Sequence, residues 1–281
     1  MLLRRGDTAK TRHADTATRR RGDAWRILTG AIIACAFGQV SDYQQGVALI
    51  EKGQFSAAVP LLTRATQARP RDAQAWKALG VAYAAQQLYS DAEPVFRRAC
   101  ELDARLADAC YYHGRALYAL DRYEASLRAL ELAQRADANS WKVHLGVAQA
   151  LEALGRAAEA EKKFRQALSL CRNTDSQPGI AYAHFLLRQG RVTEATAPLE
   201  EVLKRFPTSA EANTHLGRAL LEQGNVTGAI QHLERAVAAD PSSAQAHLLL
   251  AKGYVRAGRT AEAQPHFDAA ARYEAAAQGA R

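Results

Sequence analysis

The residues that are scarce in this sequence narrow its fold class. Aromatic residues make up 7% of the 281 residues, and methionine occurs once. No stretch sustains the alternation of apolar and polar residues that a half-buried strand shows. Few aromatic residues and many alanines suit close helix packing better than a strand-rich core. We therefore expect an all-α protein, and its 48% of hydrophobic residues is enough to bury a core.

Motifs of catalysis and metal binding are also missing. The sequence has no phosphate-binding P-loop, dinucleotide fingerprint, G-x-S-x-G or H-E-x-x-H. Its eight histidines are scattered, and Cys110 with His113 on one helix face supplies only two of the ligands that a metal site needs. We predict no catalytic residues, no metal ligands, no cofactor and no small-molecule substrate, so we expect that the protein is not an enzyme.

The four cysteines, which are Cys35, Cys100, Cys110 and Cys171, form no C-x-x-C pair. Zinc ribbons and thioredoxin-like redox sites are thereby excluded. Isolated cysteines on helices are usually small buried side chains, and we expect that here. A bridge between Cys100 and Cys110 in an oxidising compartment is the alternative that stays open.

The formal charge of +8 lies mostly at one end of the chain. Residues 1–38 contain eight Lys or Arg and three Asp, which accounts for +5 of the total. The remaining residues are nearly balanced, with both signs interspersed. A balanced surface argues against nucleic acid as a partner.

Residues 1–38 are expected to be a disordered basic leader that ends in an apolar segment at 27–38. This segment is too short to span a bilayer, which needs about 20 apolar residues. Basic residues, a short apolar run and the small residues Ala34 and Ala36 are typical of a signal peptide. We predict export to a periplasmic or other extracytoplasmic location. An uncleaved anchor, acylation at Cys35 and a cytoplasmic protein are the alternatives, so the membrane would be met only through an anchor or lipid.

One stretch, 73–104, carries a recognisable helical hairpin pattern. Trp76, Leu79, Gly80 and Tyr83 fall at helical spacing and share one apolar face. A second helix follows with Ala92, Phe96 and Ala99 in the pattern A-x3-F-x2-A. In its W-x2-L-G-x2-Y helix and this second helix, the stretch resembles the tetratricopeptide repeat (TPR) family.

The same pattern recurs every 34 residues, counted with Ala73 as position 1 and with one inserted residue near 171–178. Position 8 is always small: Gly46, Gly80, Gly114, Ala148, Ala183, Gly217 and Ala251. Position 24 is always large and apolar: Leu62, Phe96, Leu130, Phe164, Leu199, Leu233 and Phe267. Position 15 is glycine in five of seven copies, Gln87 and Asp121 being the exceptions. Glycine ends a helix in the left-handed conformation at little cost.

The resemblance implies a right-handed superhelical solenoid of about seven helix-turn-helix repeats, since single hairpins cannot bury their own apolar faces. We expect the array at 39–274, followed by a tail at 275–281. The expected repeats are 39–72, 73–106, 107–140, 141–175, 176–209, 210–243 and 244–274.

The resemblance also implies that the first helices line a concave groove, with positions 5, 9, 12 and 13 among those facing it. We expect this groove to be apolar and aromatic toward its N-terminal half and basic toward its C-terminal half. Such a surface suits a peptide with an acidic part and apolar anchors. The alternative is that these side chains are merely solvated. The candidate groove residues are Tyr111, Arg115, Tyr118, Gln149, His184, Arg188, Arg218, Lys252 and Arg256.

The sequence therefore predicts a non-enzymatic scaffold or adaptor that binds a protein or peptide segment in its groove. The alternative is a structural or assembly component, either of an envelope complex or of a self-associating array. This alternative rests on the end of the array, where no polar capping helix follows the seventh repeat.

Overall fold

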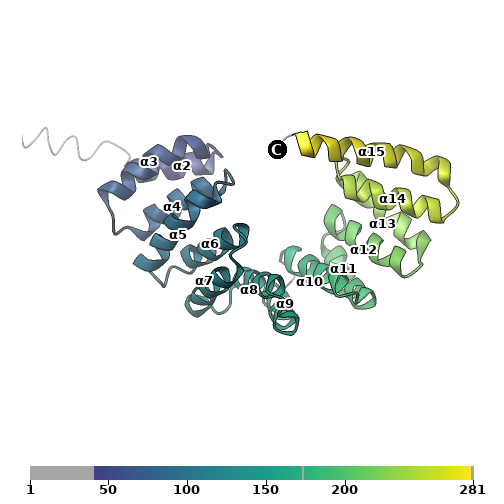
Figure 1. The fold of residues 1–281 in the computed structure, drawn as a ribbon, viewed down its shortest axis with the longest axis horizontal. Helices are drawn as coiled ribbons and strands as arrows, with labels where there is room; N and C mark the ends of the chain where they lie inside the picture. The colour runs from purple at the N-terminus through teal and green to yellow at the C-terminus, as the bar shows by residue number, and fades with distance from the viewer. Residues whose placement is uncertain (1–40, 173, 280–281) are drawn as a thin grey trace, which may run out of the picture. The chain divides into compact units, whose positions relative to one another are not determined.

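The computed structural model describes residues 41–172 and 174–279, and within these ranges the chain forms fourteen helices and no strand (Figure 1). The all-α prediction is confirmed. None of the described helices is both long and apolar enough to cross a bilayer. The predicted leader, its apolar segment at 27–38 and Cys35 lie outside the described residues.

The chain divides into two units, residues 1–70 and 71–281. The described part of the first unit is one hairpin of α2 (Asp42–Glu51) and α3 (Phe55–Ala68). Ser41 and Gln44 form a capping box at the start of α2, in which each side chain bonds the backbone N–H of the other. Gly46 is buried against Leu62, so the position 8 and position 24 residues of this copy pack together.

The second unit holds six further hairpins. Their helices are α4 (Ala73–Ala84), α5 (Tyr89–Leu102), α6 (Ala107–Ala119), α7 (Tyr123–Ala136), α8 (Trp141–Ala153), α9 (Ala157–Cys171), α10 (Gln177–Arg188), α11 (Val192–Arg205), α12 (Ala210–Glu222), α13 (Val226–Ala239), α14 (Ala244–Arg256) and α15 (Thr260–Gly279). Each first helix packs on its own second helix, and from α6 onward it also packs on the second helix of the preceding hairpin.

First helices also touch the first helices of neighbouring hairpins, in the pairs α4–α6, α6–α8, α8–α10, α10–α12 and α12–α14. Among the described residues, no two second helices come into such contact. Within the second unit the first helices therefore form the inner row and the second helices the outer one. We call the surface of the inner row, from α4 to α14, the inner face.

Close approach at position 8 explains why only small residues occur there. A Cβ atom added to Gly80 would lie 2.6 Å from the ring of Phe96, and one added to Gly114 would lie 2.5 Å from Leu130. In the same hairpin as Gly114, Ser126 occupies position 20, where the other six copies have alanine. Its buried hydroxyl donates to the carbonyl of Gly114 at 2.7 Å, so the polar group has a partner.

The turn between the two helices of each hairpin requires the left-handed conformation whatever residue occupies it. Gly155 has φ 73°, and the two exceptions, Gln87 and Asp121, have φ 61° and 57°. The expected role of position 15 is confirmed, and the exceptions adopt the same turn instead of a different one.

Three polar residues at position 4, where the family pattern has tryptophan, share a structural role. His144 Nε2 lies 2.9 Å from the carbonyl of Ala138, and His247 Nε2 lies 3.0 Å from that of Pro241. Asn213 Nδ2 donates to the carbonyl of Pro207 at 3.1 Å. Each bond ties a first helix to the loop before it, because the accepting carbonyl always belongs to position 32 of the preceding repeat.

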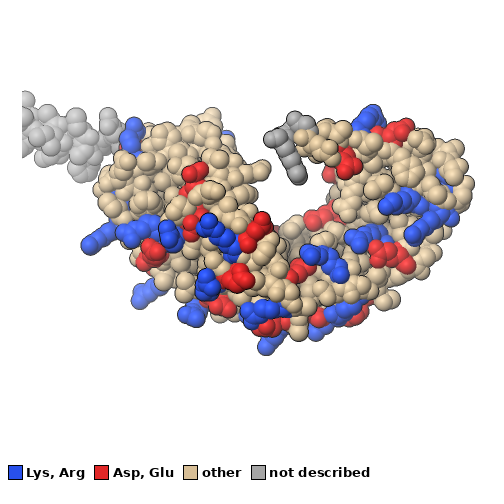
Figure 2. Space-filling model, in the orientation of Figure 1, with Lys and Arg blue, Asp and Glu red and all other residues tan. Residues whose placement is uncertain are grey.

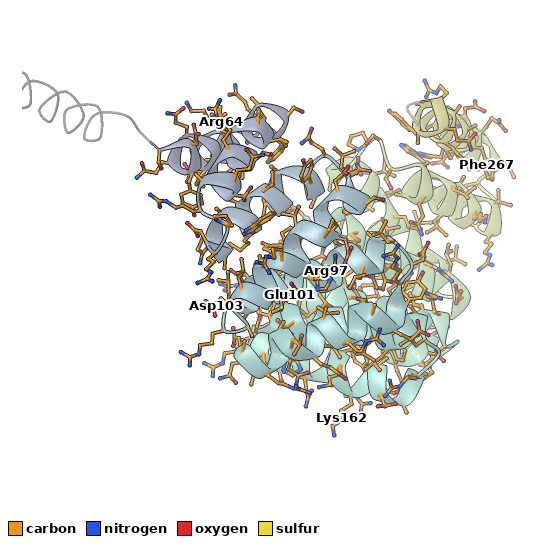
Figure 3. The ribbon with its side chains drawn as sticks, turned by 60° about the vertical axis from the view of Figure 1, so that its left-hand side comes forward. Arg64, Arg97, Glu101, Asp103, Lys162 and Phe267 are labelled. Atoms are coloured by element: carbon orange, nitrogen blue, oxygen red, sulfur yellow. A yellow bond between two sulfur atoms is a disulfide. The ribbon has the colours of Figure 1, made fainter. Side chains whose placement is uncertain are left out.

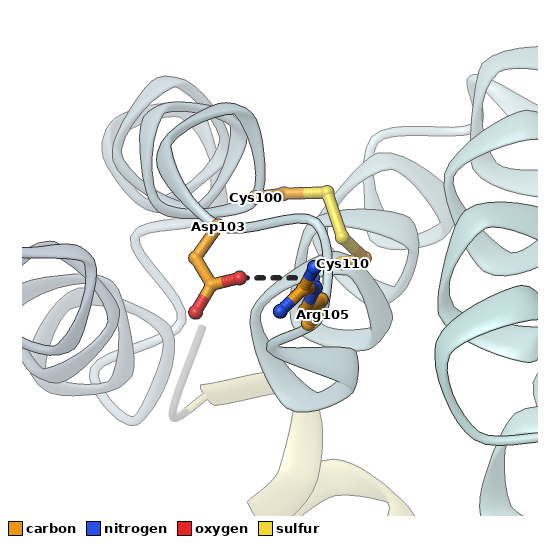
Figure 4. Close-up of a disulfide and its surroundings, with 4 residues drawn as sticks. All are labelled: Cys100, Asp103, Arg105 and Cys110. Carbon is orange, nitrogen blue, oxygen red and sulfur yellow. Dashed lines mark hydrogen bonds between the residues drawn. A yellow bond between two sulfur atoms is a disulfide. The ribbon is translucent and has the colours of Figure 1, made fainter.

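Cys100, in the last turn of α5, and Cys110, in the first turn of α6, form a disulfide (Figure 4). Their Cα atoms are 4.8 Å apart, within the range that a bridge requires. In the loop between them, Asp103 Oδ1 accepts a hydrogen bond from the backbone N–H of Arg105 at 3.0 Å. The expectation of isolated buried thiols is wrong for this pair, because packing α6 on α5 brings the two side chains together. It is confirmed for Cys171, which is buried and free.

The last helix is longer than its counterparts. α15 has 20 residues, whereas α11 and α13 have 14 each. Residues 275–279, which we assigned to a tail, continue α15.

Candidate protein-binding face

All nine candidate groove residues lie on the first helices α6 to α14 of the second unit. Arg115 and Gln149, both at position 9, come from adjacent hairpins, and Arg115 Nη1 donates to Gln149 Oε1 at 2.8 Å. Equal positions on successive first helices therefore lie side by side here.

Two tyrosines contribute aromatic surface near the N-terminal end of this set. Tyr111 is partly buried, and a Cβ on Gly146 of the next first helix would lie 3.6 Å from its ring. Burial raises the pKa of Tyr111, so its phenol stays neutral and can donate a hydrogen bond. Tyr118 packs instead on Tyr123 of its own second helix, with ring centroids 5.3 Å apart.

Position 5 contributes less open apolar surface than we expected. Leu145, Ile180 and Thr214 at this position are all buried. The following first helix covers them, so they belong to the core. Leu248, on the last first helix that the structure describes, is 38% exposed.

An acidic residue that the sequence reasoning missed lies among the candidates. Glu152 occupies position 12 of α8, and its side chain is only 13% exposed. Its Oε1 lies 3.3 Å from Nη1 of Arg188, which is 61% exposed and comes from α10. Burial raises the pKa of Glu152, while Arg188 and His184 act against that shift. Its position in the repeat was the available signal, but at position 12 the sequence reasoning considered only aromatic and apolar residues.

His184 and His215 meet between α10 and α12, with ring centroids 5.3 Å apart. His215 is buried, and its Nδ1 atom has no hydrogen-bond partner among the described residues. Burial, together with the nearby His184 and Arg218, lowers the pKa of His215 to about 4. His215 is therefore neutral at pH 7 and adds no positive charge to the inner face.

The C-terminal cations are partly satisfied within the fold. Arg218 pairs with Glu222 at 2.9 Å, and Arg256 Nη1 donates to the carbonyl of Leu221 at 2.6 Å. Lys252 is exposed and forms no ion pair or hydrogen bond within the part of the chain that the structure describes. The expected basic half is thus a mixed surface, because carboxylates on the first helices pair with two of its four cations, Arg188 and Arg218.

Charge is mixed elsewhere too. Figure 2 shows Lys and Arg interspersed with Asp and Glu across the visible surface. Within the described ranges, no group of three or more His, Cys, Asp or Glu side chains could hold a metal ion.

The sequence matches family profiles described as "Tetratricopeptide repeat" over residues 43–107, 111–178, 186–253 and 220–281. These matches cover most of the chain, so the protein belongs to the tetratricopeptide repeat family. A comparison with curated proteins found no significant match.

Solved structures agree with this fold. The Cut9–Hcn1 hetero-tetramer of the APC/C matches with a TM-score of 0.67 and 16% identity, over 81% of this chain and 45% of that one. Pseudomonas aeruginosa PilF matches at 0.62 and 20% identity, over 75% and 96%. TTC0263, a TPR protein from Thermus thermophilus, matches at 0.54 and 25% identity, over 64% and 97%. This chain therefore spans less than half of the Cut9–Hcn1 chain. These likenesses define the fold, and the TPR fold supports a role as a protein-interaction scaffold.

Proposed function

We propose that this protein is a non-enzymatic scaffold that binds a peptide or protein segment along the inner face of its second unit. The observation that carries the proposal is the alignment of first helices, which brings Arg115 beside Gln149 and Glu152 beside Arg188. Side chains from three successive first helices thereby form one continuous polar surface between the motif positions. A surface that runs across several hairpins suits an extended or helical segment better than a compact small molecule.

The chemistry of this surface sets the kind of partner. Tyr111 and Tyr118 offer amphipathic rings, and Arg188 and Lys252 offer exposed cations. A segment with apolar anchors and acidic residues would complement both groups. Glu152 adds a specificity element, because a partner carboxylate that approaches Arg188 must compete with it.

Charge reversal on the inner face tests the proposal. We would compare the proteins captured from cells by the wild type and by Arg188→Glu/Lys252→Glu. The matched control is Arg128→Glu/Lys162→Glu, which makes the same charge change on the second helices α7 and α9. Figure 3 shows Lys162 projecting away from its helix. We expect the inner pair to lose a partner that the outer pair retains. Equal capture by both variants would remove the inner face as the binding surface.

We also propose that the protein works in an oxidising, extracytoplasmic compartment. The support is the Cys100–Cys110 disulfide, since such bridges persist outside the cytosol, together with the basic and apolar composition of residues 1–38. Intact-mass analysis of the native protein tests both points. We expect a mature chain that starts near residue 37–39 and lacks two thiol protons. A full-length chain with free thiols would contradict this location.

A further inference from the structure

The hairpin α14–α15 has a groove on the side that faces away from the preceding hairpin. Its volume is about 610 Å³, and its lining is mostly apolar, with Ser242, Gln245 and Glu274 as the polar members beside Ala244, Leu248, Phe267, Ala270, Ala271, Tyr273 and Ala277. We call this the terminal groove. Of the residues that line the terminal groove, only Leu248 occupies one of the repeat positions 5, 9, 12 and 13, which were expected to face the inner groove. The terminal groove is otherwise separate from the inner-face residues described above.

The earlier hairpins show what normally fills such a groove. A Cβ on Gly146 of α8 would lie 3.1 Å from Leu130 and 3.6 Å from Tyr111, so the next first helix covers positions 24 and 5 of the hairpin before it. Likewise Cys110 of α6 bonds Cys100 at position 28. The residues at these three positions in the last hairpin are Leu248, Phe267 and Ala271. All three line the terminal groove.

Among the described residues, side chains at equivalent positions are more exposed in the terminal groove than in the inner junctions. At position 24, Phe96 and Phe164 are each 1% exposed, whereas Phe267 is partly exposed. At position 5, Ile180 is 2% exposed and Leu248 is 38% exposed. The terminal groove therefore continues the series of hairpin junctions that holds the second unit together.

The groove is also held in shape. The ring of Tyr273 stacks on His247 with centroids 5.8 Å apart, and His247 Nε2 is bonded to the carbonyl of Pro241 at 3.0 Å. In addition, α15 is longer than the other second helices, and its extra turns add Ala277 to the lining of the groove. A preformed apolar surface loses little entropy when a helix binds to it.

Charge and pattern decide between a partner protein and a second copy. Glu274 is the one charged residue lining the groove, and it lies between Ala271 and Ala277 on the same face of α15. Antiparallel pairing of two α15 helices would bring Glu274 near its counterpart, and like charges would oppose that contact. A basic helix would instead complement Glu274.

In four of the five first helices that fill the inner junctions, positions 3, 7 and 10 are all buried, as with Ala246, Leu250 and Gly253 in α14, and in the fifth, α6, only position 7 is polar, with the partly buried His113. Gly253 lies against Ile230 of the preceding hairpin. The first hairpin has Ser41 and Gln45 at positions 3 and 7. That polar pattern makes α2 of a second copy a poor match for an apolar groove.

We propose that the terminal groove is a second interaction surface, which binds a basic amphipathic helix of a partner protein. The helix sits where the first helix of a next hairpin would lie. It presents a small residue, a large apolar residue four positions later and a small residue three positions after that, with Lys or Arg beside Glu274.

A peptide with the sequence of residues 243–256 is the probe, because α14 fills the equivalent groove one hairpin earlier. The peptide carries a fluorophore and a side-chain staple on its polar face, since helices this short are marginal in water. Binding to the full-length protein is measured by fluorescence anisotropy. A peptide with Leu250→Glu has the same length but a broken apolar stripe, and we expect it not to bind.

Variants of the protein locate the site. Ala271→Glu places a carboxylate in the groove, and we expect it to weaken binding about tenfold or more. Ala276→Glu makes the same change on the opposite side of α15 and should leave binding unchanged, as should the inner-face variant Arg188→Glu. No binding by the wild type, or equal binding by Ala271→Glu, would overturn the proposal. A concentration-dependent dimer in sedimentation that Ala271→Glu dissociates would assign the groove to a second copy and overturn it as well.

Discussion

At the scale of single residues, the turn between the two helices of each hairpin is where side-chain identity matters most for the backbone. Gln87 and Asp121 take a left-handed conformation that five other copies give to glycine. A residue with a Cβ pays about 1 kcal/mol for this conformation. Asp121 recovers part of that cost, because its carboxylate accepts a hydrogen bond from the hydroxyl of Tyr123 at 2.5 Å.

Gln87→Gly should therefore stabilise the protein by roughly 0.5–1 kcal/mol, since Gln87 is exposed and its strain is removed without loss of a contact. The midpoint of urea unfolding measures the effect. Asp121→Gly should gain less, because it also loses the bond to Tyr123. Gly155→Gln is the reverse control and should lose a similar amount. An unchanged or lower midpoint for Gln87→Gly would show that this turn is not strained.

Some of the residues that matter for packing and for the inner face could be predicted from the sequence and others could not, for physical reasons. Positions 8 and 24 were predictable, because a small residue and a large apolar residue, such as Gly80 and Phe96, recur there in every copy. Glu152 was not, because its ion pair with Arg188 joins two helices and depends on the register between hairpins. Local patterns predict the contacts within a hairpin better than those between hairpins.

At the scale of the helices, specific contacts fix how one hairpin meets the next. Glu161 of α9 is the centre of one junction. Its carboxylate accepts two bonds from Arg191 at 2.7 and 3.0 Å, one from Arg165 at 2.6 Å and one from the Tyr182 hydroxyl at 3.1 Å. The bonds from Arg191 lower the pKa of Glu161, and burial opposes that shift only in part.

Glu161→Gln should lower stability at pH 7 by an amount on the order of 1 kcal/mol, because the network is partly exposed. The folded pKa of Glu161 is depressed, so its contribution is complete above the unfolded value of about 4.3 and is lost as the pH falls through the folded value. Thermal midpoints measured from pH 7 to pH 3 should therefore differ between wild type and variant near neutrality and converge in acid. A difference that stays constant over this range would contradict the assignment.

The Cys100–Cys110 bridge fixes the junction between α5 and α6. Closing a loop of this length stabilises a protein by about 2–3 kcal/mol in the chain-entropy account. Cys100→Ala/Cys110→Ala should lower the free energy of unfolding by about that amount, and reductant should lower that of the wild type but not that of the variant. Urea unfolding with and without reductant measures both. Identical curves for oxidised and reduced wild type would remove the bridge as a stabilising element.

At the scale of the whole molecule, repetition explains both what was predictable and what was not. The array and its all-α class follow from a 34-residue period, which survives the inserted residue near 171–178. At the last described hairpin we assigned residues 275–281 to a tail, whereas α15 continues through Gly279, and the repeat pattern carries no signal for this extension. The mixed charge of the inner face was missed because these carboxylates do not follow the repeat: glutamate occurs at position 12 only as Glu152, and at position 13 only as Glu51 and Glu222.

The central claim is that the inner face, and not the outer helices, contacts the partner. Site-specific photo-crosslinking tests it most directly, with a photoreactive amino acid in place of Tyr118 or Lys252 on the inner face, or of exposed Leu132 on α7. After irradiation in cells, we expect the same partner protein to be joined to positions 118 and 252 and not to position 132. Crosslinks only at position 132, or equal yields at all three positions, would contradict the account.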